Sequence, residues 1–266
     1  MFTSSLQLKR GYRIGHFNYW RKYIMMTEKN GSPGPYKKIS PGYMLLLLVS
    51  TFLFSILYHS VALLFNNNPM PLFDYIVFTS ILVILITGGY QLFFWVQNNN
   101  YFFKIKCFAT KLDDLIPFWP IWIWPYSFLY YIMIGMIAIQ IGSIQEGMYL
   151  AFGGLILLLI QCICFLLLPC KVPDSYRDYE VNTLSKRYLN FVQQLDNGRN
   201  CFPSMHNSVA VYVGLFLVPS IGVWSYIFIA TIAISTVLVK QHTIIDTVPG
   251  LVLGWGIFTL LENFIF

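Results

Sequence analysis

Residues 203–246 read PSMHNSVAVYVGLFLVPSIGVWSYIFIATIAISTVLVKQHTIID. Two apolar runs, Pro203–Val218 and Val223–Val239, flank a Pro-Ser-Ile-Gly turn, and proline and glycine are strong breakers of regular structure. The stretch therefore predicts two short membrane helices folded into a hairpin. A hairpin returns the chain to its starting face, so we expect His206 and His242, which lie near its two outer ends, to meet.

The composition of the whole chain agrees with a membrane setting. Of the 266 residues, 57% are hydrophobic and 11% are charged, against roughly 25% charged residues in ordinary soluble domains. The mean hydropathy is +0.62. A disordered chain needs low hydrophobicity and high charge, and a soluble globule needs more polar material for its surface. The sequence predicts an all-α polytopic membrane protein.

Seven segments are candidates for transmembrane helices, which need about 20 apolar residues each. The two segments of the hairpin are the shortest of them. Aromatic residues crowd the start of the third segment, which is typical of the headgroup level. The predicted spans are Gly42–Phe65, Leu72–Val96, Pro120–Ile141, Met148–Leu168, Pro203–Val218, Val223–Val239 and Thr243–Asn263.

Charge separates an N-terminal tail from the membrane domain. The net charge is +6, and residues 1–41 hold eight basic residues and one acidic residue, which leaves −1 for the rest. Such a tail is usually a cytoplasmic anchor on anionic lipid and not a nucleic-acid-binding face. We predict a basic tail at 1–41, a membrane domain at 42–266 and no nucleic-acid partner. No apolar stretch with a cleavage site precedes the first span, so we expect no cleaved signal peptide.

The first histidine motif stands at the predicted start of a helix. Pro203 is suited to a first helical position and Ser204 can cap the first turn. His206 would then lie within that turn. A helix N-terminus has free N–H groups and the positive end of the dipole, which favour phosphate.

The second motif pairs a histidine with a carboxylate. His242 and Asp246 are four residues apart and share a helix face. An aspartate at this spacing can accept one ring N–H and aim the other nitrogen outward as a base or nucleophile. Asp246 lies just inside an apolar span, where an ionisable residue is a functional candidate.

The predicted topology gathers these residues on one side of the membrane. The preceding polar segment, residues 169–202, brings cations to the same side. This combination suits phosphoryl transfer, in which cations hold phosphate oxygens, one histidine attacks and the other protonates the leaving group. The cations at the edges of that segment are Lys171, Arg177 and Arg199.

At these residues the chain resembles the type 2 phosphatidic acid phosphatase superfamily. Its signatures are a Lys…Arg-Pro segment, a Pro-Ser-x-His segment, and a Ser-Arg segment followed by His-x-x-x-Asp. Pro203–His206 matches the second signature. Ser235, followed by His242 and Asp246, matches the third in spacing.

The chain departs from the family pattern at two places. Lys171 and Arg177 have five residues between them where the first signature has six, and Asp178 replaces its proline. Thr236 replaces the arginine of the third signature. Lys240, one helical turn beyond Thr236, is a candidate to supply the missing charge.

The resemblance implies a six-helix phosphatase-like core at about residues 113–266, with an extra N-terminal span. It implies that His242 is the nucleophile and forms a phosphohistidine, that Asp246 orients it, and that His206 is the acid for the leaving alcohol. No metal ion or other cofactor is implied. The residues expected to hold phosphate are Ser204, Lys171, Arg177 and Lys240.

Three functions remain open from the sequence. Water as acceptor gives a lipid phosphatase acting on lipid phosphate monoesters or diphosphates. A lipid hydroxyl as acceptor gives a phosphotransferase similar to inositol phosphorylceramide or sphingomyelin synthases, and the degenerate signatures lean toward that branch. The third is a non-catalytic membrane protein of the same fold. A phospholipid or lipid phosphate is the expected partner of the first two.

The side of the membrane on which the site lies depends on the number of spans. With the basic tail inside, seven spans place both histidine motifs inside, and the basic loop at residues 97–118 agrees. The resemblance instead implies the outer or luminal face. One span fewer before residue 119 would reverse the prediction. The charge pattern favours the cytoplasmic face, and both sides are kept open.

Overall fold

The computed structural model describes residues 41–100, 102–195 and 198–265. The predicted tail at 1–41 therefore lies almost wholly outside the described residues. The chain divides into two units, Met1–Leu48 and Val49–Phe266, and the second contains every feature discussed below. The helical elements are α2 (Pro41–Phe65), α3 (Leu72–Asn99), α4 (Lys111–Leu115), η1 (Pro120–Trp122), η2 (Pro125–Leu129), α5 (Tyr130–Gln140), α6 (Ile144–Leu167), η3 (Asp174–Arg177), α7 (Leu184–Leu195), α8 (Met205–Ile221), α9 (Val223–Leu238) and α10 (Ile244–Ile265).

Each of the seven predicted spans is helical, so the prediction of an all-α polytopic membrane protein is confirmed. In the described residues, five helical stretches are long and apolar enough to cross a membrane, and α8 and α9 are shorter apolar helices. Large apolar side chains stay exposed along them, as expected for contact with lipid. The five longer stretches are Leu45–Phe65, Leu72–Asn99, Pro120–Gln140, Ile144–Leu167 and Ile244–Asn263.

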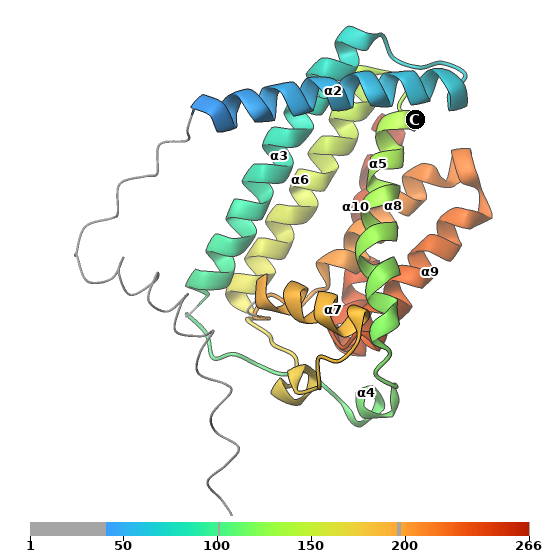
Figure 1. Cartoon of the computed structure of the whole chain (residues 1–266). Coiled ribbons are helices and arrows are strands. Elements are labelled where there is room, and N and C mark those ends of the chain that lie inside the picture. Colours follow the sequence, from blue (N-terminus) through green and yellow to red (C-terminus); the bar gives the residue numbers. More distant parts are fainter. Residues whose placement is uncertain (1–40, 101, 196–197, 266) are drawn as a thin grey trace, which may run out of the picture. The chain divides into compact units, whose positions relative to one another are not determined.

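Helix α8 is the centre of the core and packs against α5, α6, α9 and α10 (Figure 1). Its approach to α10 is close because α10 presents two glycines to the backbone of α8. A Cβ atom added to Gly250 would lie 2.6 Å from the carbonyl oxygen of Ser204, and one added to Gly254 would overlap the backbone of Ser208. The small residues at 250 and 254 therefore bring the start of α10 beside the start of α8.

The Val49–Phe65 part of α2 crosses the ends of α3 and α5 and does not run alongside them (Figure 1). Its protein-facing side is small or polar: Ser55 and Ala62 are buried, and the Ser55 hydroxyl contacts that of Thr79 in α3. Just beyond its end, the Asn66 amide donates to the carbonyl oxygen of Ile139 at 3.1 Å. Large apolar side chains of α2 such as Leu53, Leu57 and Leu64 are exposed, whereas Tyr58 packs against the core.

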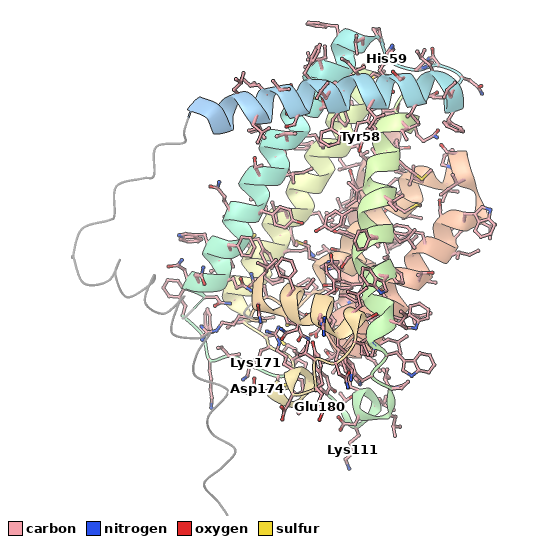
Figure 2. The ribbon with its side chains drawn as sticks, viewed as in Figure 1. Tyr58, His59, Lys111, Lys171, Asp174 and Glu180 are labelled. Carbon is pink, nitrogen blue, oxygen red and sulfur yellow. The ribbon has the colours of Figure 1, made fainter. Side chains whose placement is uncertain are left out.

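At the other end of the helices, backbone hydrogen bonds join the long connections to one another. The Lys171 N–H donates to the carbonyl of Lys106 at 2.9 Å, and the Cys201 N–H donates to that of Cys170 at 3.2 Å. The α3–α4 and α6–α8 connections are therefore fixed side by side. Figure 2 shows Lys171 at this end and His59 of α2 at the opposite one.

Candidate active site

The second histidine motif is built on the end of α9. The N–H groups of Gln241 and His242 both donate to the carbonyl oxygen of Thr236, at 3.1 and 3.2 Å. The chain can double back here because Lys240 adopts a left-handed conformation with φ 58°, which usually favours glycine. This turn places His242 against the helix end.

In the first histidine motif, Ser204 is the N-cap of α8, as the sequence predicts, whereas Pro203 precedes the cap and is not the first helical residue. The Ser204 hydroxyl accepts hydrogen bonds from the N–H of Asn207 at 3.4 Å and from its side-chain amide at 3.0 Å. The N–H of Ser204 itself donates to the carbonyl of Asp246 at 2.9 Å. Ser204 therefore begins α8 and ties it to α10 at the same point.

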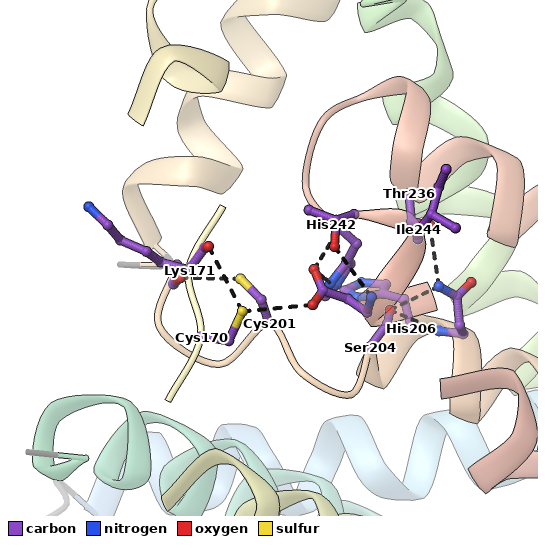
Figure 3. Close-up of polar contacts among 12 residues, drawn as sticks. Cys170, Lys171, Cys201, Ser204, His206, Thr236, His242 and Ile244 are labelled. Atoms are coloured by element: carbon purple, nitrogen blue, oxygen red, sulfur yellow. Dashed lines mark hydrogen bonds and ion pairs between the residues drawn. The ribbon is translucent and has the colours of Figure 1, made fainter. Parts of the chain in front are cut away.

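The two motifs meet, as the predicted hairpin requires. The ring centroids of His206 and His242 are 6.3 Å apart (Figure 3). Nδ1 of His242 lies 4.0 Å from Oδ2 of Asp246, and this nitrogen has no hydrogen-bond partner among the described residues. Asp246 is fully buried, and Oδ2 accepts the N–H of Thr243 at 2.9 Å. A small ring movement would complete the His242–Asp246 hydrogen bond.

Two tyrosines hold the ring of His206, and sequence reasoning did not identify them. The ring of Tyr126 stacks on His206 with centroids 4.2 Å apart, and its hydroxyl lies 3.2 Å from Nδ1 of His206. The ring of Tyr130 also lies against His206, with its centroid 4.8 Å from that of the imidazole ring. The signal was present in the aromatic cluster of the third span, but the headgroup interpretation accounted for it.

Asp113 and Lys240 fasten α4 to the turn that carries His242. The buried carboxylate of Asp113 accepts the N–H of Ile244 at 2.8 Å and the N–H of Thr110 at 2.7 Å. The Lys240 ammonium donates to the carbonyls of Asp113 and Ile116, at 2.6 and 2.7 Å. Burial by itself would raise the pKa of Asp113, but these hydrogen bonds and the charge of Lys240 outweigh it and lower that pKa.

The predicted phosphate-binding cations lie around the site with other partners in this structure. Lys171 pairs with Asp174 at 2.8 Å and points away from His242 (Figures 2 and 3). Arg177 donates to the carbonyl of Gln193 at 3.3 Å. Lys240 is held by α4, so a contact with phosphate would require it to change partners.

Thr236, where the family signature has arginine, is fully buried. Its hydroxyl accepts the side-chain amide of Asn207 at 3.3 Å, and that same amide also donates to Ser204. A neutral amide thus bridges the two signatures where a cation is expected. Within the described ranges, no three His, Cys, Asp or Glu side chains gather closely enough to hold a metal ion.

Burial determines the protonation of His242. It lowers the pKa of His242 to about 4, and a hydrogen bond with the backbone of Cys201 opposes that shift. The ring is therefore neutral near pH 7, and one of its two nitrogens keeps a lone pair. For Nε2 to attack an electrophile, the ring must exchange its hydrogen bond with the backbone of Cys201 for one from Nδ1 to Asp246.

A pH profile checks this assignment. Protonation below the pKa removes the lone pair, so the acidic limb of kcat/KM due to His242 is expected near pH 4 and not near the free value of about 6.5. The second ionisation of a phosphate substrate, at about pH 6, gives its own limb. That limb moves when the substrate is changed, whereas the His242 limb stays in place. A fixed limb near pH 6.5 would contradict the prediction.

The attachment of α4 gives a second prediction. Replacing Asp113 by Asn removes one of the two oxygen atoms that accept the N–H groups of Ile244 and Thr110. Each buried polar group that is left unsatisfied lowers the free energy of unfolding by about 1–3 kcal/mol. We expect Asp113→Asn to lower the midpoint of thermal unfolding and to reduce kcat more than it changes KM. The neighbouring Asp114 is exposed, so Asp114→Asn is the matched control. Equal behaviour of the two variants would contradict the role of Asp113.

These features define a class: a polytopic helical membrane protein with two histidines and a buried aspartate gathered beside a helix N-terminus. Residues 114–260, more than half of the chain, match the PAP2 superfamily, and the chain belongs to that superfamily. No curated protein and no solved structure matches the chain. Superfamily members are generally phosphatases or phosphotransferases, so membership indicates phosphatase-like lipid phosphoester chemistry.

Proposed function

We propose that the chain is a membrane lipid phosphatase that hydrolyses lipid phosphate monoesters or diphosphates through a phosphohistidine on His242. The observation that carries this proposal is the meeting of His206 and His242, 6.3 Å apart, with Asp246 beside one nitrogen of His242. A phosphorus atom held between the two rings is within reach of both.

In the first half of the reaction, a ring nitrogen of His242 attacks phosphorus. A nitrogen–phosphorus bond forms, and the bond from phosphorus to the oxygen of the leaving group breaks. His206, which takes up a proton when the phosphate anion binds beside it, gives that proton to the leaving oxygen. The lipid alcohol departs, or the lipid monophosphate when the substrate is a diphosphate. Asp246 stabilises the positive charge that the ring of His242 gains.

In the second half, water attacks the phosphohistidine. His206, now neutral, takes a proton from the water as its oxygen bonds to phosphorus. The nitrogen–phosphorus bond breaks, inorganic phosphate departs, and both histidines return to their initial states. The same residue therefore serves as acid and then as base.

The start of α8 supports phosphate binding in this mechanism. The first N–H groups of a helix have no acceptor within it, and the positive end of the helix dipole favours an anion. We place the phosphate there, beside Ser204. Lys171 and Arg177 complete the site from the loop, and Lys171 exchanges its exposed partner Asp174 for a phosphate oxygen. Lys240 takes part only if it leaves α4.

A lipid hydroxyl as acceptor is the second candidate function. It is favoured by the burial of His242, of which 7% is exposed, and by the neutral Thr236–Asn207 contact where the family has an arginine. A site that excludes water favours transfer to an alcohol over hydrolysis. The chemistry at His242 is the same, and only the second half-reaction differs.

The experiment measures phosphate release by the purified protein in mixed micelles. The substrates are phosphatidate and a lipid diphosphate, each with and without ceramide or diacylglycerol. Inorganic phosphate as the product supports the phosphatase. No release from folded protein, but headgroup transfer from a phospholipid to the added alcohol, would establish the phosphotransferase. If folded protein gave neither phosphate release nor headgroup transfer, both proposals would be contradicted and a non-catalytic membrane protein would be favoured.

A further inference from the structure

An apolar cavity of about 300 Å³ lies between α3, α5, α6 and α8. It is separate from the polar contacts of the site, and hydrocarbon groups form nearly all of its wall. We call it the α3/α5 groove. Residues from all four helices line it, among them Ile86, Tyr90, Ile134, Gly154, Leu158 and Val209.

One end of the groove reaches the candidate acid. Tyr130 and Met205 both line it. The ring of Tyr130 also lies against His206, with centroids 4.8 Å apart, and Met205 directly precedes His206 in α8. A group that leaves phosphorus and takes a proton from His206 would therefore stand at the mouth of this groove.

The groove extends from that mouth into the membrane layer. Its lining runs from Tyr130 to Ile137 along α5 and from Met205 to Val213 along α8, which is about 10–12 Å at 1.5 Å per residue. Along α3 it runs from Phe78 to Phe93, which is about 22 Å at the same rise. A methylene group is comparable in size to a water molecule, which occupies about 30 Å³. The volume is therefore enough for one hydrocarbon chain of about ten methylene groups.

The side of the groove between α3 and α5 opens to lipid. Tyr90 and Tyr131 line this side, are 39% and 53% exposed, and join their hydroxyls by a hydrogen bond of 2.6 Å. Leu157 and Leu150, on the inner wall, are buried. This hydroxyl pair bridges α3 and α5, so a chain that enters sideways from the bilayer passes beside the hydrogen bond and stops against the closed wall.

We infer that the α3/α5 groove binds one hydrocarbon chain of the substrate, the chain of the alcohol that leaves from phosphorus at His206. This inference rests on the proposed function and specifies its substrate: a phosphoester whose alcohol carries a linear chain. Lipid tails are as apolar as the groove, so in a bilayer the groove positions the ester more than it adds affinity.

Gly154 of α6 provides a way to fill the groove. A Cβ added there meets no atom within 4 Å, so Gly154→Phe places its ring in the groove without a backbone clash. Gly256 of α10 also has open space around its Cβ position, and it does not line the groove. Gly256→Phe is therefore the matched control.

The test uses alkyl phosphates from butyl to dodecyl, each as dissolved monomers. For the wild type we expect kcat/KM to rise about fourfold for each added methylene group and to level off when the groove is full. Gly154→Phe should retain the activity on butyl phosphate and level off at a shorter chain. Gly256→Phe should follow the wild type. The same chain-length dependence in both variants would overturn the inference.

A second measurement does not depend on catalysis. Phosphatidate with a photoreactive diazirine in its chain is irradiated with the protein in nanodiscs, and labelled peptides are identified. Labelling concentrated at Ile134 and Val209, and lost in Gly154→Phe, supports the groove. Labelling spread evenly over exposed residues such as Phe73 and Trp255 would overturn it. If phosphate release fails while this labelling succeeds, the proposed reaction is wrong and the groove stands.

Discussion

His242→Ala is expected to abolish phosphate release, with a loss of about 10⁴-fold or more in kcat. The reason is that the proposed covalent intermediate has no other nitrogen on which to form, and removal of a nucleophile eliminates the whole two-step route. With radioactive phosphate in the substrate, the wild type should retain protein-bound label on rapid quenching. That label should be lost in acid and kept in base, as expected for a phosphohistidine.

The matched control is another histidine outside the site. His59 lies in α2, at the opposite end of the molecule from Lys171 (Figure 2), and its ring packs against that of Tyr75 at a tilt of 60°. His59→Ala should therefore keep both activity and label. If His242→Ala retained either one while remaining folded, the nucleophile would have to be sought elsewhere.

His206→Ala is expected to lose about 10²–10⁴-fold in kcat on phosphatidate, which is the usual contribution of general acid catalysis. A lipid alkoxide is a poor leaving group and needs the proton. Nitrophenolate leaves without a proton. With p-nitrophenyl phosphate as the substrate, the first step in His206→Ala should therefore show only a small part of this loss in rate. Protein-bound label should then accumulate, because hydrolysis of the intermediate still lacks its base.

This pattern separates chemistry from folding. A variant that had lost its structure would be equally slow with both substrates. Tyr126→Phe is a useful companion because it keeps the ring that stacks on His206 and removes only the hydroxyl near Nδ1. We expect a smaller loss with the same dependence on the leaving group. An equal loss in the rate of the first step with both substrates, without accumulation of protein-bound label, would contradict the role of His206 as the acid.

The hairpin was predictable because its signals are local. Two apolar runs joined by a short turn return their outer ends together, and His206 and His242 stand at those ends. The turn itself is shorter than predicted, because α8 continues through Pro219 to Ile221 and only Gly222, with φ 57°, links it to α9. The N-cap role of Ser204 was predictable for the same reason, because it depends only on the residues next to it in the sequence. Seven apolar segments likewise predicted seven helices, because a lipid environment leaves few alternatives for a backbone.

Other parts of the site depend on contacts between distant residues. The left-handed turn at Lys240 aims its side chain at α4, more than a hundred residues earlier in the chain. Charge and position alone favoured phosphate as its partner. Asp113, Tyr126 and Asn207 act through tertiary contacts that have no sequence signature of their own. The course of α2 across the ends of α3 and α5 is also set by packing, since its length and hydropathy suit a span equally well.

All the connections that carry the site lie at one end of the helices, and the groove extends from there into the membrane layer. The headgroup of the proposed substrate would therefore be taken from the monolayer on that side. Each turnover on phosphatidate removes an anionic headgroup from that monolayer and leaves the other unchanged. Because surface potential follows the density of anionic lipid, the proposed reaction would act as a source of transverse electrical asymmetry in the membrane.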